Sequence, residues 1–324
     1  MTKRLIAMCI AVTTVLVLFS GCQLWKSKKE DSVLPSYNKD LPADELDGMD
    51  GMTPDELDLL AGRLQEGGYL PEGVTIPPEA PTMPQPLTLP AGDKIDNAEV
   101  AKLVKAVQEI IKTRTFYLKG TGNNPMGNNA YAPMVMAVDQ DKLMVETETD
   151  WTAMMKEMAK EEGKVDLGQS RIQGAVMQTT FGKKLRMIFL HSGAYMVLPE
   201  KNLYTNLSTL AGEDISDVAG DLVKSFSNSS SAEVEGKMTA SRVKVGDKEY
   251  LCATLPMEDG QYVKYFFLKE ELKRMEFIAD DGTSSVIEID EFSGKVDPNL
   301  FKIEGMKEMN PSEMTGMFSG FDFG

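Results

Sequence analysis

The chain has 324 residues, of which 42% are hydrophobic and 26% are charged, and its formal net charge is −16. This composition is sufficient for one substantial hydrophobic core or two small ones. The acidic balance excludes a surface built for nucleic acid, because such a surface repels phosphates. Three cysteines are too few for a disulfide-rich scaffold.

The N-terminus has the pattern of an export signal. Lys3 and Arg4 precede an apolar run at 5–19, and about 15 residues are too few for an ordinary membrane span. The run ends in Phe19-Ser20-Gly21-Cys22, which resembles the bacterial lipobox, with Phe in a place usually taken by Leu. The resemblance implies a signal peptide at 1–21 and a diacylglycerol thioether on Cys22. A plain secretory signal and an uncleaved anchor are the alternatives, and all three export the chain.

The lipid on Cys22 is the expected membrane anchor. No later apolar run approaches the roughly 18 residues of a span, and two acyl chains are enough for stable attachment. Loss of residues 1–21 removes two basic groups and no acidic group, so the net charge becomes −18. We therefore expect a lipid-anchored protein that faces the extracytoplasmic side of the cell membrane, with its folded part held away from anionic lipid.

Residues 22–95 are predicted to be an acidic, proline-rich tether, because they show no sustained apolar period. A short helix is predicted within it, near 54–66, where Thr53 and Glu56 form a capping box. Its apolar residues follow at helical spacing: Leu57, Leu60 and Leu64. We interpret it as a helix that docks on the domain or frays in solution, and a partner-binding motif is the alternative.

The folded domain is predicted at 96–303, and it opens with an amphipathic helix. The apolar stripe of this helix comprises Val100, Leu103, Val104, Val107, Ile110 and Ile111. From Thr115 onward β signals dominate, and they indicate a first strand, two hairpins and a four-strand meander. The predicted strands lie at 115–120, 134–138, 142–149, 185–191, 195–198, 249–255, 262–268, 273–279 and 284–290.

Two further amphipathic helices are predicted between the strands, at 151–160 and around 214–226. The apolar face of the first comprises Trp151, Met154, Met155 and Met158, and that of the second comprises Ile215, Val218, Leu222 and Phe226. A long antiparallel sheet needs such helices, because water cannot cover both of its faces.

The order of these elements resembles the LolA/LolB-like superfamily of lipoprotein carriers and related envelope lipoproteins. The segments that carry the resemblance are 265–268, 273–277, 286–289 and the closing Val296-Asp297-Pro298-Asn299-Leu300-Phe301. It covers about 96–303 and implies an α+β fold with a curved antiparallel sheet, an unclosed half β-barrel, whose concave face is covered by amphipathic helices. It also implies a cleft for a lipid, an acyl chain or a lipoprotein.

The eight apolar residues of the two inner helices are the predicted ligand contacts. The chain has 22 methionines, whose unbranched thioethers adapt to irregular ligands, although ordinary core filling is the alternative. Carriers of this family often hold a lid closed with an arginine. Five arginines here are not distinguished by the sequence: Arg114, Arg171, Arg186, Arg242 and Arg274.

Catalysis is not expected, and neither is a cofactor or a metal ion. The single histidine, His191, has no neighbouring acid in the sequence, and Cys252 lies in an apolar strand as a small buried hydrophobe. Cys9 leaves with the signal and Cys22 carries the lipid, so the domain has no disulfide. The acidic clusters are interpreted as solvated charge.

The expected function is therefore the binding of a hydrophobic ligand by a membrane-anchored lipoprotein, without chemistry. The expected partners are the membrane, through Cys22, and a lipid or lipoprotein, with no nucleic acid. The alternative is an envelope interaction or sensor protein that binds a protein partner and has no lipid cavity. Residues 304–324, rich in Met, Gly and Phe, are predicted to be a loosely docked tail.

Overall fold

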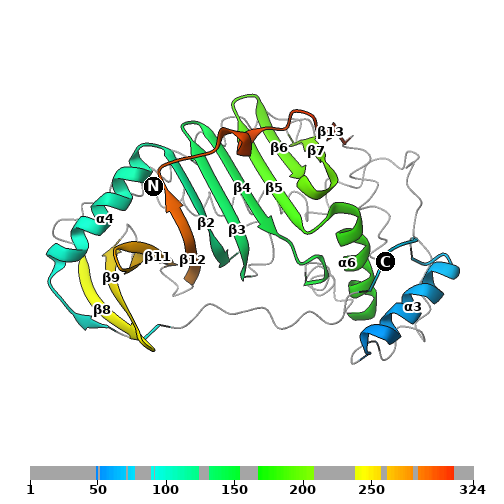
Figure 1. Ribbon diagram of the computed structural model, residues 1–324, viewed down its shortest axis with the longest axis horizontal. Coiled ribbons are helices and arrows are strands. Elements are labelled where there is room, and N and C mark those ends of the chain that lie inside the picture. The colour runs from blue at the N-terminus through cyan, green and yellow to red at the C-terminus, as the bar shows by residue number, and fades with distance from the viewer. Residues whose placement is uncertain are drawn as a thin grey trace.

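The structure is a computed structural model, and it describes residues 49, 52–70, 72–76, 89–90, 92–123, 131–153, 167–207, 238–256, 261–279 and 284–309. The fold is α+β, with one large, unclosed and mostly antiparallel sheet and a few helices (Figure 1). The described helices are α3 (Pro54–Glu66), α4 (Asn97–Lys112) and α6 (Leu167–Phe181), with 3₁₀ turns η1 (Pro199–Lys201) and η3 (Pro298–Phe301).

The strands follow one another through the chain, mostly as hairpins. They are β1 (Asp93–Lys94), β2 (Thr115–Asn123), β3 (Tyr131–Asp139), β4 (Lys142–Glu148), β5 (Lys184–Leu190), β6 (Gly193–Leu198), β7 (Leu203–Asn206), β8 (Thr239–Val245), β9 (Lys248–Pro256), β10 (Tyr262–Leu268), β11 (Glu271–Ile278), β12 (Ser284–Ser293) and β13 (Lys307–Glu308).

The described strands form one sheet in the order β1-β8-β9-β10-β11-β12-β2-β3-β4-β5-β6-β7-β13. Two meanders, β2 to β7 and β8 to β12, are joined where β12 pairs with β2. All neighbouring strands are antiparallel except β7 and β13, which are parallel. The two end strands have two residues each, and they cover the edges of β8 and β7. Short end strands limit edge-to-edge association of a sheet this wide.

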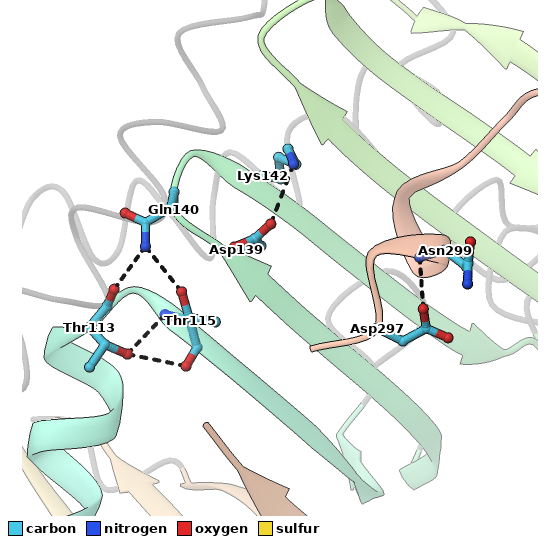
Figure 2. Close-up of polar contacts among 7 residues, drawn as sticks. All are labelled: Thr113, Thr115, Asp139, Gln140, Lys142, Asp297 and Asn299. Carbon is cyan, nitrogen blue, oxygen red and sulfur yellow. Dashed lines mark hydrogen bonds and ion pairs between the residues drawn. The ribbon is translucent and has the colours of Figure 1, made fainter. Parts of the chain in front are cut away.

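The turn between β3 and β4 is attached to the end of α4, as Figure 2 shows. Gln140 has a left-handed φ of 61°, and its side-chain amide donates to the carbonyl oxygen of Thr113 at 3.2 Å and to Oγ1 of Thr115 at 3.1 Å. Asp139 and Lys142 form an ion pair across the same turn. The helix and the first hairpin are thereby fixed relative to each other.

Helix α4 packs on β2, β8 and β9, and we call the sheet face that it covers the inner face. Asp96 caps the helix by accepting a hydrogen bond from the backbone N–H of Ala98 at 2.8 Å. The predicted stripe faces the sheet: Val100, Val104, Val107 and Ile111 are buried, and Leu103 and Ile110 are partly buried against the same core.

The inner face carries the main core, which extends across nearly the whole sheet. Its residues alternate along the central strands, as a pleated sheet requires. Those on the central strands are Phe116, Leu118, Met134, Met136, Val138, Leu143, Val145, Leu185, Met187 and Phe189.

The opposite, outer face of the central strands is also apolar, because the C-terminal segment 294–309 crosses it. Phe301, in the closing motif 296–301, packs with Ala137, Met144 and Ile188. Asp297 caps η3 by accepting from the backbone N–H of Asn299 at 2.9 Å (Figure 2). The segment ends as β13 beside β7 (Figure 1). Both faces of β3 to β6 are therefore buried, which explains the near-continuous apolar runs of these strands.

The α+β class, the open antiparallel sheet and the nine strands predicted from sequence are confirmed, with small shifts of their ends. The helix predicted near 54–66 is α3, Pro54–Glu66. The structure begins its sheet slightly before residue 96, because β1 pairs with β8. The tail is described as far as Met309, which is buried. The prediction for 214–226 lies outside the described residues, as does most of that for 151–160.

Candidate functional site

Of the eight predicted ligand contacts, the structure describes Trp151. Met154, Met155, Met158, Ile215, Val218, Leu222 and Phe226 lie outside the described residues. Trp151 begins a helical segment, where the carboxylate of Asp150 accepts from the backbone N–H of Ala153 at 2.9 Å. The side chain is 5% exposed and belongs to the inner-face core. This position is compatible with a movable cover over the inner face. It is equally compatible with a fixed part of the core.

The indole of Trp151 is attached to the C-terminal end of α6. Its Nε1 donates to the carbonyl oxygen of Gly182 at 2.7 Å, and its ring lies 5.5 Å from that of Phe181 between centroids. Met177 and Phe181 bring the last turn of α6 into the inner-face core. This end of α6 and Trp151 form one apolar cover, which we call the α6 cover.

The α6 cover is packed closely through a glycine. A Cβ added at Gly174 would lie 2.6 Å from the Cα of Thr152, so the backbones of α6 and of the segment after Trp151 are in direct contact. Only glycine permits an approach this close without displacement of one backbone. The two parts of the cover are therefore expected to move together.

The other side of α6 packs against residues near the N-terminus, which we call the α3 module, residues 49 and 52–76 as far as they are described. Figure 1 shows α6 between the sheet and α3. Ile172 and Ala175 of α6 are buried together with a cluster from the module: Met49, Leu57, Leu60, Ala61, Leu64, Leu70, Val74 and Ile76. This module lies within the segment predicted to be a tether.

One buried hydrogen bond joins α6 to the module. Arg171, which is 2% exposed, donates from Nη1 to the carbonyl oxygen of Met49 at 2.9 Å. The module is held together internally by the capping box of Thr53 and Glu56 and by a bond from Gln65 Nε2 to the carbonyl oxygen of Val74 at 2.9 Å. Of the five arginines that the sequence left unranked, this one lies in α6 itself.

A second buried arginine lies on the outer face, on β11 in the second meander. Arg274 donates to Glu276 at 2.6 Å and to Glu288 at 2.5 Å, and its guanidinium lies 5.8 Å from the centre of the Phe266 ring. Lys264 lies 3.6 Å from Glu276. The charges balance, so we interpret this group as a structural network on β10, β11 and β12.

The remaining arginines are at the surface or in ordinary pairs. Arg186 pairs with Glu146 at 2.6 Å, and Arg242 lies 3.3 Å from Glu249. Arg114 has a left-handed φ of 54° at the turn after α4. None of these three adjoins the α6 cover in the residues that the structure describes.

The residues considered for chemistry are dispersed. His191 is exposed in the turn between β5 and β6, whereas Cys252 is buried on the outer face, where burial raises the pKa of its thiol despite hydrogen bonds with Ser241 and Thr254. Within the described ranges, no group of three His, Cys, Asp or Glu side chains is placed to hold a metal ion. None of the helices described there is both long enough and apolar enough to cross a membrane.

Comparison with known proteins places few limits on the function. No family model matches the chain, and no curated protein matches it. A solved structure of PNGF-II aligns with 64% of this chain and 33% of its own, at 10% identity and a TM-score of 0.23. The chain thus corresponds to about a third of that protein's length, and a likeness this low carries no argument about fold or activity.

Helix α6, which is central to this site, was not predicted from the sequence. Its sequence, LGQSRIQGAVMQTTF, has two glycines and several β-branched residues and no single apolar stripe. The structure explains the missing stripe, because the helix is buried on one side by the α3 module and on the other by the inner-face core. A helix between two layers has no continuous polar face.

Proposed function

We propose that this chain is a lipid-anchored extracytoplasmic binding protein of LolA/LolB-like type, which takes up a hydrophobic ligand between the inner sheet face and the α6 cover. Cys22 carries the anchor in this proposal, and no catalysis takes place. The ligand class is a lipid, an acyl chain or the acylated end of a lipoprotein.

The observation that carries the proposal is that two different segments of the chain cover the inner face. Helix α4 covers the β8, β9 and β2 part of it, whereas Trp151, Met177 and Phe181 reach the same core from a different segment, the connection between β4 and β5. A cover that is attached separately can be displaced without unfolding the sheet. The surface beneath it is apolar, and acyl chains would gain about 25 cal/mol for each Å² of apolar surface they bury there.

The methionines support the same site. Seven of the described methionines belong to the inner-face core: Met134, Met136, Met177, Met187, Met238, Met275 and Met309. All are nearly buried in the present state, so a ligand would replace existing contacts with α6 or its neighbours. Flexible thioethers adjust to such an exchange at small cost, because they have several low-energy rotamers.

A direct test is native mass spectrometry of the full mature chain after exposure to phospholipid vesicles, with a photoactivatable fatty acid as the probe. We expect a stoichiometric adduct with crosslinks in β4 and β5, beneath the α6 cover. Crosslinks confined to the outer strand surface, or no adduct at any lipid concentration, would overturn the proposal.

The second candidate is an interaction or sensor protein with a filled interior. The observation that favours it is the low exposure of the inner-face residues, since Leu143, Met187 and Phe189 are already covered by protein. This candidate predicts that the mature chain stays free of lipid and retains a protein partner from envelope extracts. The same photolabelling experiment separates the two.

A further inference from the structure

The buried hydrophobic residues of α6 belong to two clusters that share no residue. The last turn, with Met177 and Phe181, belongs to the inner-face core, while Ile172 and Ala175 belong to the cluster of the α3 module. In the part of the chain that the structure describes, every buried member of that second cluster comes from 49–76 or from α6. Among the described residues, the buried apolar contacts of the module with the rest of the protein are therefore made with α6.

We propose that the α3 module is a clasp for the α6 cover, so that the segment next to the lipid anchor controls access to the inner face. The inference rests on the proposed function for its biological meaning, and on the packing of α6 for its mechanism. With the module docked, α6 is buried on both sides and Arg171 is bonded to Met49. With the module released, one side of α6 loses its apolar contacts.

The position of the module close to the lipid anchor determines which movement would open the clasp. Met49 follows the lipidated Cys22 by 27 residues, which can span at most about 97 Å when fully extended. A larger separation between membrane and domain would pull on Met49 and hence on the bond from Arg171. Attachment to a distant partner would thereby loosen the cover, and relaxation toward the membrane would allow it to close.

Two adjacent leucines of α3 provide a matched test. Leu60 is 0% exposed in the module cluster. Leu59, about 100° further around the helix, is 70% exposed in a shallow depression with Met52, Glu56 and Arg63. Leu60→Asp should undock the module, and Leu59→Asp should not. Leu60→Ala provides a milder variant in case the aspartate impairs folding.

The measurement is amide hydrogen exchange of the full mature lipidated chain in detergent, read separately for α6 and for β10. With Leu60→Asp or Leu60→Ala, we expect exchange in residues 170–181 to accelerate about tenfold while β10 remains protected. With Leu59→Asp, both should match the unmodified chain. Exchange in α6 that stays unchanged while α3 loses protection would overturn the clasp. So would an equal acceleration in β10, because the module would then be part of the global core.

Lipid uptake by the same variants separates this inference from the proposed function. Faster uptake with Leu60→Ala, alongside faster exchange in α6, supports both. Faster exchange in α6 in a chain that never takes up lipid supports the clasp and overturns the binding cleft. Normal uptake with unchanged α6 exchange overturns the clasp alone.

Discussion

The indole nitrogen of Trp151 donates a 2.7 Å hydrogen bond to the carbonyl oxygen of Gly182, which joins the segment after β4 to the residue after α6. Gly182 has a left-handed φ of 82°, and its own N–H donates to the carbonyl oxygen of Gln178 at 2.8 Å. The helix end thus turns sharply and presents a carbonyl to the indole. This relationship closes the α6 cover on the inner face.

Trp151→Phe should lower the free energy of unfolding by about 1 to 3 kcal/mol, because the buried Gly182 carbonyl loses its donor while the ring packing on Phe181 is largely kept. Urea denaturation measures the change. Trp25→Phe, in the predicted tether, serves as the control and should leave the stability unchanged. Equal stability of the two variants would show that the bond does not hold the cover.

Gly174→Ala should destabilise the protein by about 1 to 3 kcal/mol, because the added methyl would meet the Thr152 backbone and force α6 away from it. The matched control is Gly62→Ala in α3, where a Cβ would meet nothing within 4 Å. That change should stabilise α3 by up to about 1 kcal/mol, because alanine is the better helix former. Thermal unfolding of both variants gives the comparison, and changes of the same sign would contradict the close contact at Gly174.

Arg274→Ala should cost about 3 kcal/mol, because it leaves the Glu276 carboxylate buried without its main partner. Lys264, 3.6 Å from Glu276, keeps the loss near the low end of the range for a broken buried pair. Arg242→Ala removes an exposed pair with Glu249 and should cost less than about 1 kcal/mol. Chemical denaturation of the two alanine variants tests this difference, and similar costs would show that burial of Arg274 has little energetic effect.

The buried Tyr265 should make the folded protein less stable at high pH. Burial raises the pKa of its hydroxyl from 10.0 to about 12. Between these values the unfolded chain loses the proton and the folded chain keeps it, so ionisation favours unfolding. Below pH 10 the ionisation of Tyr265 does not reduce the free energy of unfolding. As the pH rises from 10 toward 12, the free energy of unfolding falls by about 1.4 kcal/mol per pH unit.

Tyr265→Phe should remove that part of the slope. The measurement is the free energy of unfolding of both proteins from pH 9 to pH 12. The difference between them should grow steadily above pH 10 in favour of the phenylalanine variant. Parallel curves would show that Tyr265 reaches solvent before it ionises.

The β10–β11 turn can be improved. Lys269 and Glu270 both have left-handed φ angles, 50° and 70°, as a two-residue type I′ hairpin requires. Side chains other than Gly and Asn adopt this region at a cost of about 1 to 2 kcal/mol per residue. Lys269→Asn with Glu270→Gly should therefore raise the midpoint of thermal unfolding, and a lower midpoint would show that the wild-type side chains stabilise the turn by other means.

The elements whose signals are local could be predicted from the sequence. The Thr53 and Glu56 capping box defined the start of α3, and the alternation of residues 262–268 defined β10, because capping and side-chain alternation depend only on near neighbours. The apolar stripe of α4 was equally visible, since that helix has one buried face and one in water.

How these elements meet depends on long-range contacts in the folded protein. The burial of α6 on two sides removed its stripe, and the parallel pairing of β13 with β7 joins residues about a hundred positions apart. Arg171 and Arg274 resembled the other arginines in the sequence, and burial beside Met49 and Glu276 distinguishes them. Such contacts depend on which surfaces the fold brings together, and the spacing of residues along a single element does not contain that information.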